Sequence, residues 1–149
     1  MTTNQPIPIL KPLYTAHATS VGGREGTVKT DDGTLDLSIA MPPGLGGKGD
    51  KGTNPEQLFA AGYAACFGSA VGFVARQKKL TTGPITIQAD VTIGAIASGG
   101  FGLAVKLGVT LPELAQAEAE ALVAAAHQVC PYSNATRGNI EVKLEVKGQ

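Results

Sequence analysis

The chain carries, between Asn54 and Lys79, the stretch NPEQLFAAGYAACFGSAVGFVARQKK. Asn54 is a favourable helix N-cap, Pro55 suits the first helical position, and Glu56 lies where the helix dipole favours an anion. From Gln57 to Ala75 there is no charged residue, and this length approaches that of a membrane span. The run is rich in Ala, Gly and Ser rather than Leu or Ile. We therefore expect a central helix, running to about Lys79, that protein buries on all sides.

The residues before this helix are typical of extended structure. A strand is expected over Tyr14–Val21, and two more over Thr27–Thr30 and Thr34–Ala40. The sequence Asp31-Asp32-Gly33 between the last two is a strong hairpin signal. The following segment, Met41–Thr53, contains two consecutive prolines and five glycines, and we expect it to be a loop without regular structure.

The residues after the helix predict a second set of elements. Apolar residues alternate over Ile85–Ile96 and Phe101–Leu111, which predicts a long hairpin. An Ala-rich helix is expected from Pro112 to about Gln128, and Pro131 disfavours helical geometry at Cys130. A loop over Tyr132–Asn139 and a last strand over Ile140–Val146 complete the list. The pattern predicts an α+β fold, an antiparallel sheet packed on two helices, in a single domain over residues 1–149.

Composition limits the function classes. Lys plus Arg and Asp plus Glu both number 12, so the formal net charge is zero, which argues against a nucleic acid or an acidic membrane as partner. The N-terminus lacks a basic region followed by an apolar run, so we expect a cytoplasmic protein without a secretory signal. With His17 and His127 as the only histidines and no C-x-x-C pair, a metal site is not expected.

The two cysteines, Cys66 and Cys130, are the residues with the most reactive side chains. In a reducing cytosol a permanent disulfide is disfavoured. A free cysteine inside a helix is more often a small buried apolar residue than a nucleophile, and Cys66 lies too far along its helix for the dipole to ionise it. Cys130, at a helix end beside a loop, has the freedom that a resolving cysteine needs.

A reactive Cys66 therefore needs a cation from elsewhere in the fold. The arginines are Arg24, Arg76 and Arg137. Arg76 lies about 15 Å along the same helix, whereas Arg137 could approach Cys130. Arg24, flanked by glycines, is either a solvated turn residue or a mobile cation for the thiolate.

Glu56 is either a first-turn helix charge or the anchor of such an arginine. Glu56 and Cys66 are ten residues apart on one helix, about 15 Å along its axis. They can share a site only if the helix is interrupted or a second chain contributes. We therefore predict a dimer whose site combines residues of both subunits. His127 is more simply a helix C-terminal residue than a base, and Tyr63 more simply a core residue than a binding wall.

These residues alone leave three functions open. The cysteine pair fits a thiol peroxidase, a non-enzymatic redox sensor that switches a partner, or a small-ligand carrier with inert buried thiols. No basic helix supports a sensor that binds DNA.

Four segments together resemble the organic hydroperoxide resistance proteins (Ohr) of the wider OsmC/Ohr family. They are TSVGGREG (residues 19–26), GTNPEQLFAAGY (52–63), ACF (65–67) and VCPYSNATRGN (129–139). Their order and spacing agree with the family over nearly the whole chain, and the ending YSNATRGN is similar to the Ohr branch rather than the OsmC branch.

The resemblance implies an intertwined homodimer in which antiparallel sheets wrap two central helices. It implies that Cys66 is the peroxidatic cysteine, that Cys130 is the resolving cysteine, and that Arg24 and Glu56 support the thiolate. It further implies reduction of alkyl and fatty-acid hydroperoxides, re-reduction by a dithiol such as the lipoyl group of a lipoylated protein, and no cofactor.

Overall fold

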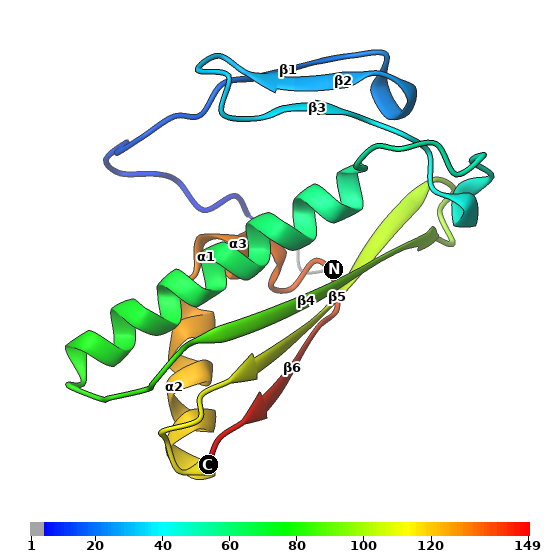
Figure 1. Cartoon of the computed structure of the whole chain (residues 1–149). Coiled ribbons are helices and arrows are strands. Elements are labelled where there is room, and N and C mark those ends of the chain that lie inside the picture. The colour runs from blue at the N-terminus through cyan, green and yellow to red at the C-terminus, as the bar shows by residue number, and fades with distance from the viewer. Residues whose placement is uncertain (1–4) are drawn as a thin grey trace. The chain divides into compact units, whose positions relative to one another are not determined.

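The computed structural model describes residues 5–149. Eleven short and long elements follow one another along the chain (Figure 1): β1 (Ala18–Val21), η1 (Gly23–Glu25), β2 (Thr27–Thr30), β3 (Asp36–Ser38), η2 (Pro43–Leu45), α1 (Pro55–Gln77), β4 (Thr86–Ala95), β5 (Phe101–Thr110), α2 (Gln116–Val129), α3 (Pro131–Thr136) and β6 (Val142–Lys147). They divide into two compact units, one through Leu58 and one from Phe59 to Gln149. The sequence prediction of a single domain over 1–149 stays a prediction.

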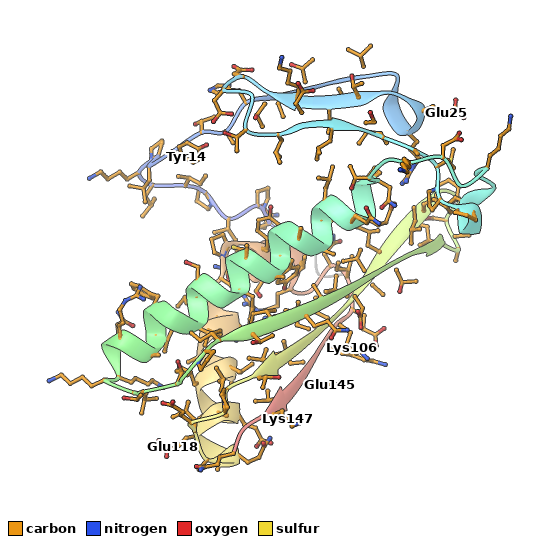
Figure 2. All side chains as sticks on the ribbon, viewed as in Figure 1. Tyr14, Glu25, Lys106, Glu118, Glu145 and Lys147 are labelled. Carbon is orange, nitrogen blue, oxygen red and sulfur yellow. The ribbon has the colours of Figure 1, made fainter. Side chains whose placement is uncertain are left out.

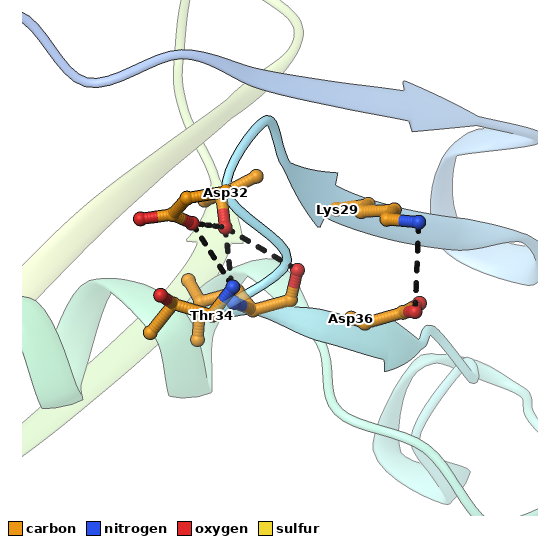
Figure 3. A network of polar contacts seen from close by, with 6 residues as sticks. Lys29, Asp32, Thr34 and Asp36 are labelled. Atoms are coloured by element: carbon orange, nitrogen blue, oxygen red, sulfur yellow. Dashed lines mark hydrogen bonds and ion pairs between the residues drawn. The ribbon is translucent and has the colours of Figure 1, made fainter.

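The first unit contains an antiparallel sheet in the order β1-β2-β3. The predicted hairpin between β2 and β3 is confirmed, with Gly33 at a φ of 74° in the turn. Asp32 stabilises this turn by accepting hydrogen bonds from the Thr30 hydroxyl (2.7 Å) and the Thr34 amide (2.9 Å), and Lys29 pairs with Asp36 across the strands (Figure 3). The turn therefore sets the register of the hairpin through local contacts.

Two expectations for the first unit need correction. The predicted strand over Tyr14–Val21 begins only at Ala18, and the residues before it pair with no strand in the part of the chain that the structure describes. The segment Met41–Thr53 is not wholly irregular, because it contains the 3-10 turn η2. Gly47 closes that turn by donating its amide hydrogen to Pro42 (3.0 Å), at a place where a Cβ would meet the carbonyl oxygen of Met41.

Helix α1 begins as the sequence predicts. The side chain of Asn54 accepts a hydrogen bond from the Gln57 amide (2.8 Å), which confirms the N-cap. At the other end, the Leu80 amide donates to Ala75 and the Lys79 amide to Arg76, the pattern of a Schellman motif, with Lys79 at a φ of 56°. This motif ends α1 at Gln77, two residues before the predicted end.

The second unit contains a sheet in the order β4-β5-β6. The long β4–β5 hairpin is confirmed as antiparallel. The expectation of a wholly antiparallel sheet is wrong, because β6 pairs in parallel with β5. The chain returns from β5 through α2 and α3, and a connection of that length allows the parallel pairing. Figure 2 shows Lys106 and Glu145 on the solvent face of this sheet, where Lys106 lies between Asp90 (3.7 Å) and Glu145 (3.9 Å).

Helix α2 begins later than predicted. The residues from Pro112 are not helical because their backbone is used elsewhere: the Leu114 carbonyl accepts the Gln149 amide (2.6 Å), and the helix starts only at Gln116. The side chain of Gln116 then donates to the carbonyl of Val146 (2.9 Å) and so joins the helix start to β6.

The loop predicted over Tyr132–Asn139 is wrong, because Pro131 opens a third helix, α3. Proline ends the preceding helix but is favourable at the first position of a new one. Cys130 has extended geometry, with φ −64° and ψ 123°, and caps both α2 and α3.

The core of the second unit lies between α1, β5 and α2. Its largest completely buried side chains include Tyr63, Phe67, Leu107 and Leu122. Gly68 lets α1 approach β4 closely, since a Cβ there would lie 3.3 Å from the Ile87 side chain.

Helix α1 is not buried on all sides in the single chain. Ala61, Ala65, Ser69 and Phe73 form an exposed stripe along it, and the Phe73 side chain is 47% exposed. Helix α1 is also long and apolar enough to cross a membrane by length and composition, a test that the core helix of a soluble protein passes too.

Candidate active site

The sulfur atoms of Cys66 and Cys130 lie 3.6 Å apart, and both cysteines are free thiols. Cys66 is in the middle of α1 and is half-buried, whereas Cys130 is completely buried between α2 and α3. A disulfide has an S–S distance of about 2.0 Å, so a small motion brings the two sulfurs to bonding distance. The 64 residues that separate them in the sequence give no hint of this contact.

The short link between α2 and α3 fixes the position of Cys130. Its amide donates to Ala126 (2.9 Å) as the last bond of α2, and its carbonyl accepts the Asn134 amide (2.9 Å) as the first bond of α3. Pro131 forces this change of direction because it cannot continue α2. Cys130 is therefore held from both sides, one residue before a helix start.

The environment of Cys66 raises the pKa of its thiol. Burial is the largest cause, and the neighbouring Cys130 raises the pKa further. The backbone N–H of Tyr132, which hydrogen-bonds the sulfur from the start of α3, lowers it. Since the thiolate is the nucleophilic form, a reactive Cys66 needs a further stabilising charge.

Arg24 and Glu56 form a bidentate ion pair in the first unit. The two guanidinium nitrogens donate to the two carboxylate oxygens at 2.8 and 2.6 Å. The pair raises the pKa of Arg24 and holds the pKa of Glu56 below its usual range, in both cases chiefly through these hydrogen bonds. The sequence interpretation of Glu56 as the anchor of an arginine therefore has a geometric basis. The four predicted site residues are brought together as two pairs, one in each unit.

The glycines around Arg24 form a defined turn. Gly22 has a φ of 82°, and the amides of Glu25 and Gly26 donate to the carbonyls of Gly22 (3.2 Å) and Gly23 (3.3 Å). At Gly26 the backbones approach so closely that a Cβ would lie 1.7 Å from the carbonyl oxygen of Val21. Glycine is therefore required at Gly26 by packing.

The substitution Gly26→Ala is expected to displace this turn and with it the Arg24–Glu56 pair. Because the Cβ meets backbone rather than a flexible side chain, the free energy of unfolding should fall by about 1–3 kcal/mol, the usual cost of overpacking. Chemical denaturation measures this loss. Gly44→Ala is the matched control, since nothing lies within 4 Å of a Cβ there. Equal stability of the two variants would contradict this interpretation.

A polar cluster, which we call the Ser133 cluster, comprises the buried residues Tyr63, Ser133 and Thr136 and the half-buried His127. The Ser133 hydroxyl lies 2.9 Å from the Tyr63 hydroxyl and 2.8 Å from Nδ1 of His127, and the Tyr63 hydroxyl lies 3.1 Å from that of Thr136. Burial, and then the charge of Arg137, lower the pKa of His127. Sequence reasoning treated Tyr63 and His127 singly and missed Ser133 and Thr136, because nothing in the sequence marks a serine or threonine as buried.

Arg137, which by its place in the sequence could approach Cys130, makes hydrogen bonds to other residues. Its guanidinium donates to the side chain of Asn134 (2.8 Å) and to the backbone carbonyl of His127, at the end of α2. Through these contacts Arg137 lies at the C-terminal end of α2, where the helix dipole favours a positive charge.

An apolar pocket of about 830 Å³ lies beside α3, entirely in the second unit. It is lined by Phe59 of α1, by Tyr132 and Ala135 of α3, and by Ile96 and Phe101 at the tip of the β4–β5 hairpin. Tyr132 joins this pocket to the cysteines, because its ring lines the pocket while its amide bonds the Cys66 sulfur. Among residues 5–149 no group of three or more His, Cys, Asp or Glu side chains is placed to hold a metal ion.

Comparison with known proteins identifies the family of the chain. Residues 47–145 match the family of OsmC-like proteins. An organic hydroperoxide resistance protein of Xanthomonas axonopodis pv. citri is 57% identical over 135 residues, which cover 90% of this chain and 94% of that protein.

Two solved structures extend the comparison. The crystal structure of an organic hydroperoxide resistance protein from Elizabethkingia anophelis is 54% identical and superposes with a TM-score of 0.90, covering 94% of this chain and 100% of that one. That of OhrB from Bacillus subtilis is 49% identical, with a TM-score of 0.85 and coverage of 91% and 100%. The α+β fold predicted from the sequence is therefore that of these proteins, and the chain belongs to the OsmC/Ohr family.

Proposed function

We propose that this protein is a thiol peroxidase that reduces organic hydroperoxides to alcohols with Cys66 and Cys130. The observation that carries the proposal is the 3.6 Å separation of two free sulfurs, in a chain whose relatives are named for organic hydroperoxide resistance. A small-ligand carrier also uses an apolar pocket, but it needs no pair of free thiols in contact, so the cysteine pair favours redox chemistry over a carrier.

The reaction consists of one oxidation by the peroxide, one condensation to a disulfide and one reduction by a dithiol. The Cys66 thiolate attacks the terminal peroxide oxygen, the O–O bond breaks, and the alkoxide takes a proton to leave as the alcohol. Cys66 becomes a sulfenic acid, which condenses with the Cys130 thiol to a disulfide with loss of water. A dithiol then reduces this disulfide by two exchange steps and is itself oxidised.

Arg24 is the proposed cation of the site. Its charge lowers the pKa of the Cys66 thiol, against the burial that raises it, and stabilises the negative charge that develops on the peroxide oxygens. Glu56 holds the guanidinium plane in position through two hydrogen bonds. Helix α1 is continuous over Pro55–Gln77, which supports the alternative in which a second chain contributes to the site. The proposal therefore includes a site shared between two subunits.

The exposed face of α1 supports a homodimer. Ala61, Ala65, Ser69 and Phe73 recur at intervals of four residues, so they form one stripe of mostly small side chains. Small side chains let a second helix approach closely, and burial of Phe73 against a partner removes an exposed aromatic side chain from water.

The apolar pocket supports an organic rather than an inorganic peroxide. Its walls include the apolar side chains of Phe59, Ile96 and Phe101, which suit an alkyl or fatty-acyl chain, and Glu141 adds a carboxylate to the lining. The reductant is proposed to be a dithiol such as a lipoyl group on a protein, and the reaction to take place in the cytoplasm, where such dithiols stay reduced.

The proposal is tested by turnover of the purified chain with a dithiol and either cumene hydroperoxide or hydrogen peroxide. Each buried methylene contributes about 0.8 kcal/mol, and about 1.4 kcal/mol is a factor of ten, so the organic peroxide should react at least about tenfold faster. It should be consumed over many cycles per chain. Consumption that stops after one equivalent in the presence of dithiol indicates a sensor, and unreactive native thiols indicate a carrier.

A further inference from the structure

One buried hydroxyl connects the three helices that carry the cysteine pair. Ser133 belongs to α3, and its oxygen lies within hydrogen-bond distance of Tyr63 on α1 and His127 on α2. Ser133 and Tyr63 are completely buried, so water does not replace a bond that is lost there. Ser133 is therefore the point at which the Ser133 cluster determines how the three helices meet.

The residues of the Ser133 cluster lie close to both cysteines in the sequence. Tyr63 precedes Cys66 by three residues on α1, His127 precedes Cys130 by three on α2, and Ser133 follows Cys130 by three. Tyr63 and Cys66 are three apart on α1 and so lie on the same face of that helix, whereas Cys130 is the residue that joins α2 to α3. The bonds of Ser133 therefore hold α1 and α2 together beside the two sulfurs, rather than at a remote point of the helices.

A donor and an acceptor can be assigned to each hydrogen bond of the Ser133 cluster without conflict. A neutral imidazole that carries its proton on Nε2 accepts the Ser133 hydroxyl hydrogen at Nδ1. The Thr136 hydroxyl donates to the Ser133 carbonyl (3.3 Å), and the Tyr63 hydroxyl then donates to the oxygen of Ser133 or of Thr136. Within the described residues no buried side-chain polar atom lacks a partner, so the loss of one hydroxyl leaves the others short of a bond.

We propose that Ser133, together with Tyr63 and His127, is a positioning residue for disulfide closure: the cluster keeps the Cys130 sulfur within reach of the Cys66 sulfenic acid. The inference rests on the proposed function. The step concerned is attack of the Cys130 sulfur on the Cys66 sulfur, in which the S–S bond forms, the S–O bond breaks, and hydroxide leaves with the thiol proton as water. The first oxidation, of Cys66 by peroxide, does not need the Cys130 sulfur and does not depend on the cluster.

The experiment measures how the sulfenic acid divides between two fates. Reduced protein receives one equivalent of cumene hydroperoxide in the presence of dimedone, which captures sulfenic acids. Mass spectrometry then gives the ratio of dimedone adduct on Cys66 to Cys66–Cys130 disulfide. The variants are Tyr63→Phe and Ser133→Ala. The matched controls are Tyr14→Phe and Ser98→Ala, which remove the same hydroxyls from exposed side chains.

In both cluster variants the ratio of adduct to disulfide should rise about fivefold over the wild type, the scale expected from one lost buried hydrogen bond. The rate of the first oxidation should stay within about twofold, and the double variant should exceed the stronger single variant only slightly, because both act on one cluster. A cluster that merely stabilises the fold lowers the free energy of unfolding but leaves the ratio unchanged.

Tyr63→Phe keeps the ring and its packing. If Ser133→Ala does not fold, the ratio of adduct to disulfide in Tyr63→Phe alone tests the inference. An unchanged ratio in folded Tyr63→Phe overturns the inference, as does an equal rise in the two controls. If the wild type itself forms no Cys66–Cys130 disulfide, the proposed function fails. If the wild type closes and the cluster variants close equally well, only the positioning role fails.

Discussion

Replacement of Cys66 by serine is expected to reduce hydroperoxide turnover by more than about 10³-fold, the scale on which removal of an enzymatic nucleophile acts. A serine hydroxyl at the same place is not ionised at neutral pH and does not form a sulfenic acid. The half-buried position should accept serine with little loss of stability, so the effect is chemical. The measurement is consumption of cumene hydroperoxide with excess dithiol, with far-UV circular dichroism as the check on folding.

Cys130→Ser separates the first oxidation of Cys66 from the formation of the disulfide. It removes the second sulfur but not the nucleophile, so one equivalent of peroxide should still oxidise Cys66, and no intramolecular disulfide should follow. If Cys66→Ser retained turnover comparable with the wild type, or if Cys130→Ser abolished the first oxidation, the assigned roles would be wrong.

Replacement of Arg24 by alanine is expected to have the second-largest effect. An opposite charge nearby lowers the pKa of an ionisable group by about 1–3 units, so its removal should raise the pKa of the Cys66 thiol by that amount. Burial already raises this pKa. At neutral pH the thiolate fraction, and with it the rate of the first oxidation, should then fall by about 10- to 10³-fold.

The direction in which the oxidation rate of Arg24→Ala changes with pH distinguishes a raised pKa of the Cys66 thiol from unfolding of the variant. The thiolate is the deprotonated form, so the rate in Arg24→Ala should recover as the pH rises towards the elevated thiol pKa. The measurement is the rate of Cys66 oxidation from pH 5 to 10. Lys29→Ala is the matched control, because it removes an exposed cation of the same unit. Superimposable pH profiles of wild type and Arg24→Ala would exclude Arg24 as the activating cation.

Elements set by local contacts were predictable from the sequence. The hairpin at Asp32 and Gly33 depends on a turn whose bonds join residues two to five apart, and the start of α1 depends on the cap by Asn54. Elements that depend on contacts between residues far apart in the sequence were not predictable. The backbone of Leu114 is engaged by Gln149, and β6 lies parallel to β5, for reasons that no local pattern carries.

Helix α3 begins at Pro131, and a proline can mark either the end of one helix or the start of the next. On the sequence alone Pro131 predicts the end of α2, although proline is also favourable at the first position of a helix. The two predictions are compatible, since Cys130 caps both helices. Because α3 was missed, so was Ser133, whose burial depends on that helix packing against α1 and α2.

The contacts between the site residues also depend on parts of the chain that are far apart in the sequence. Spacing alone did not bring Cys66 to Cys130. The residues left the pairing of Arg24 with Glu56 open as one alternative, and the family resemblance favoured it. The residues in question are 64 and 32 apart in the chain, and only tertiary packing places their side chains in contact.

The central claim is that Cys66 and Cys130 form one redox pair, and the most direct test is a peptide map of the protein after one equivalent of alkyl hydroperoxide. The proposed function predicts one disulfide between the peptides of Cys66 and Cys130 of the same chain, reversed by a dithiol with recovery of both thiols. Oxidation that leaves the Cys130 thiol free, or disulfides found only between chains, would contradict it.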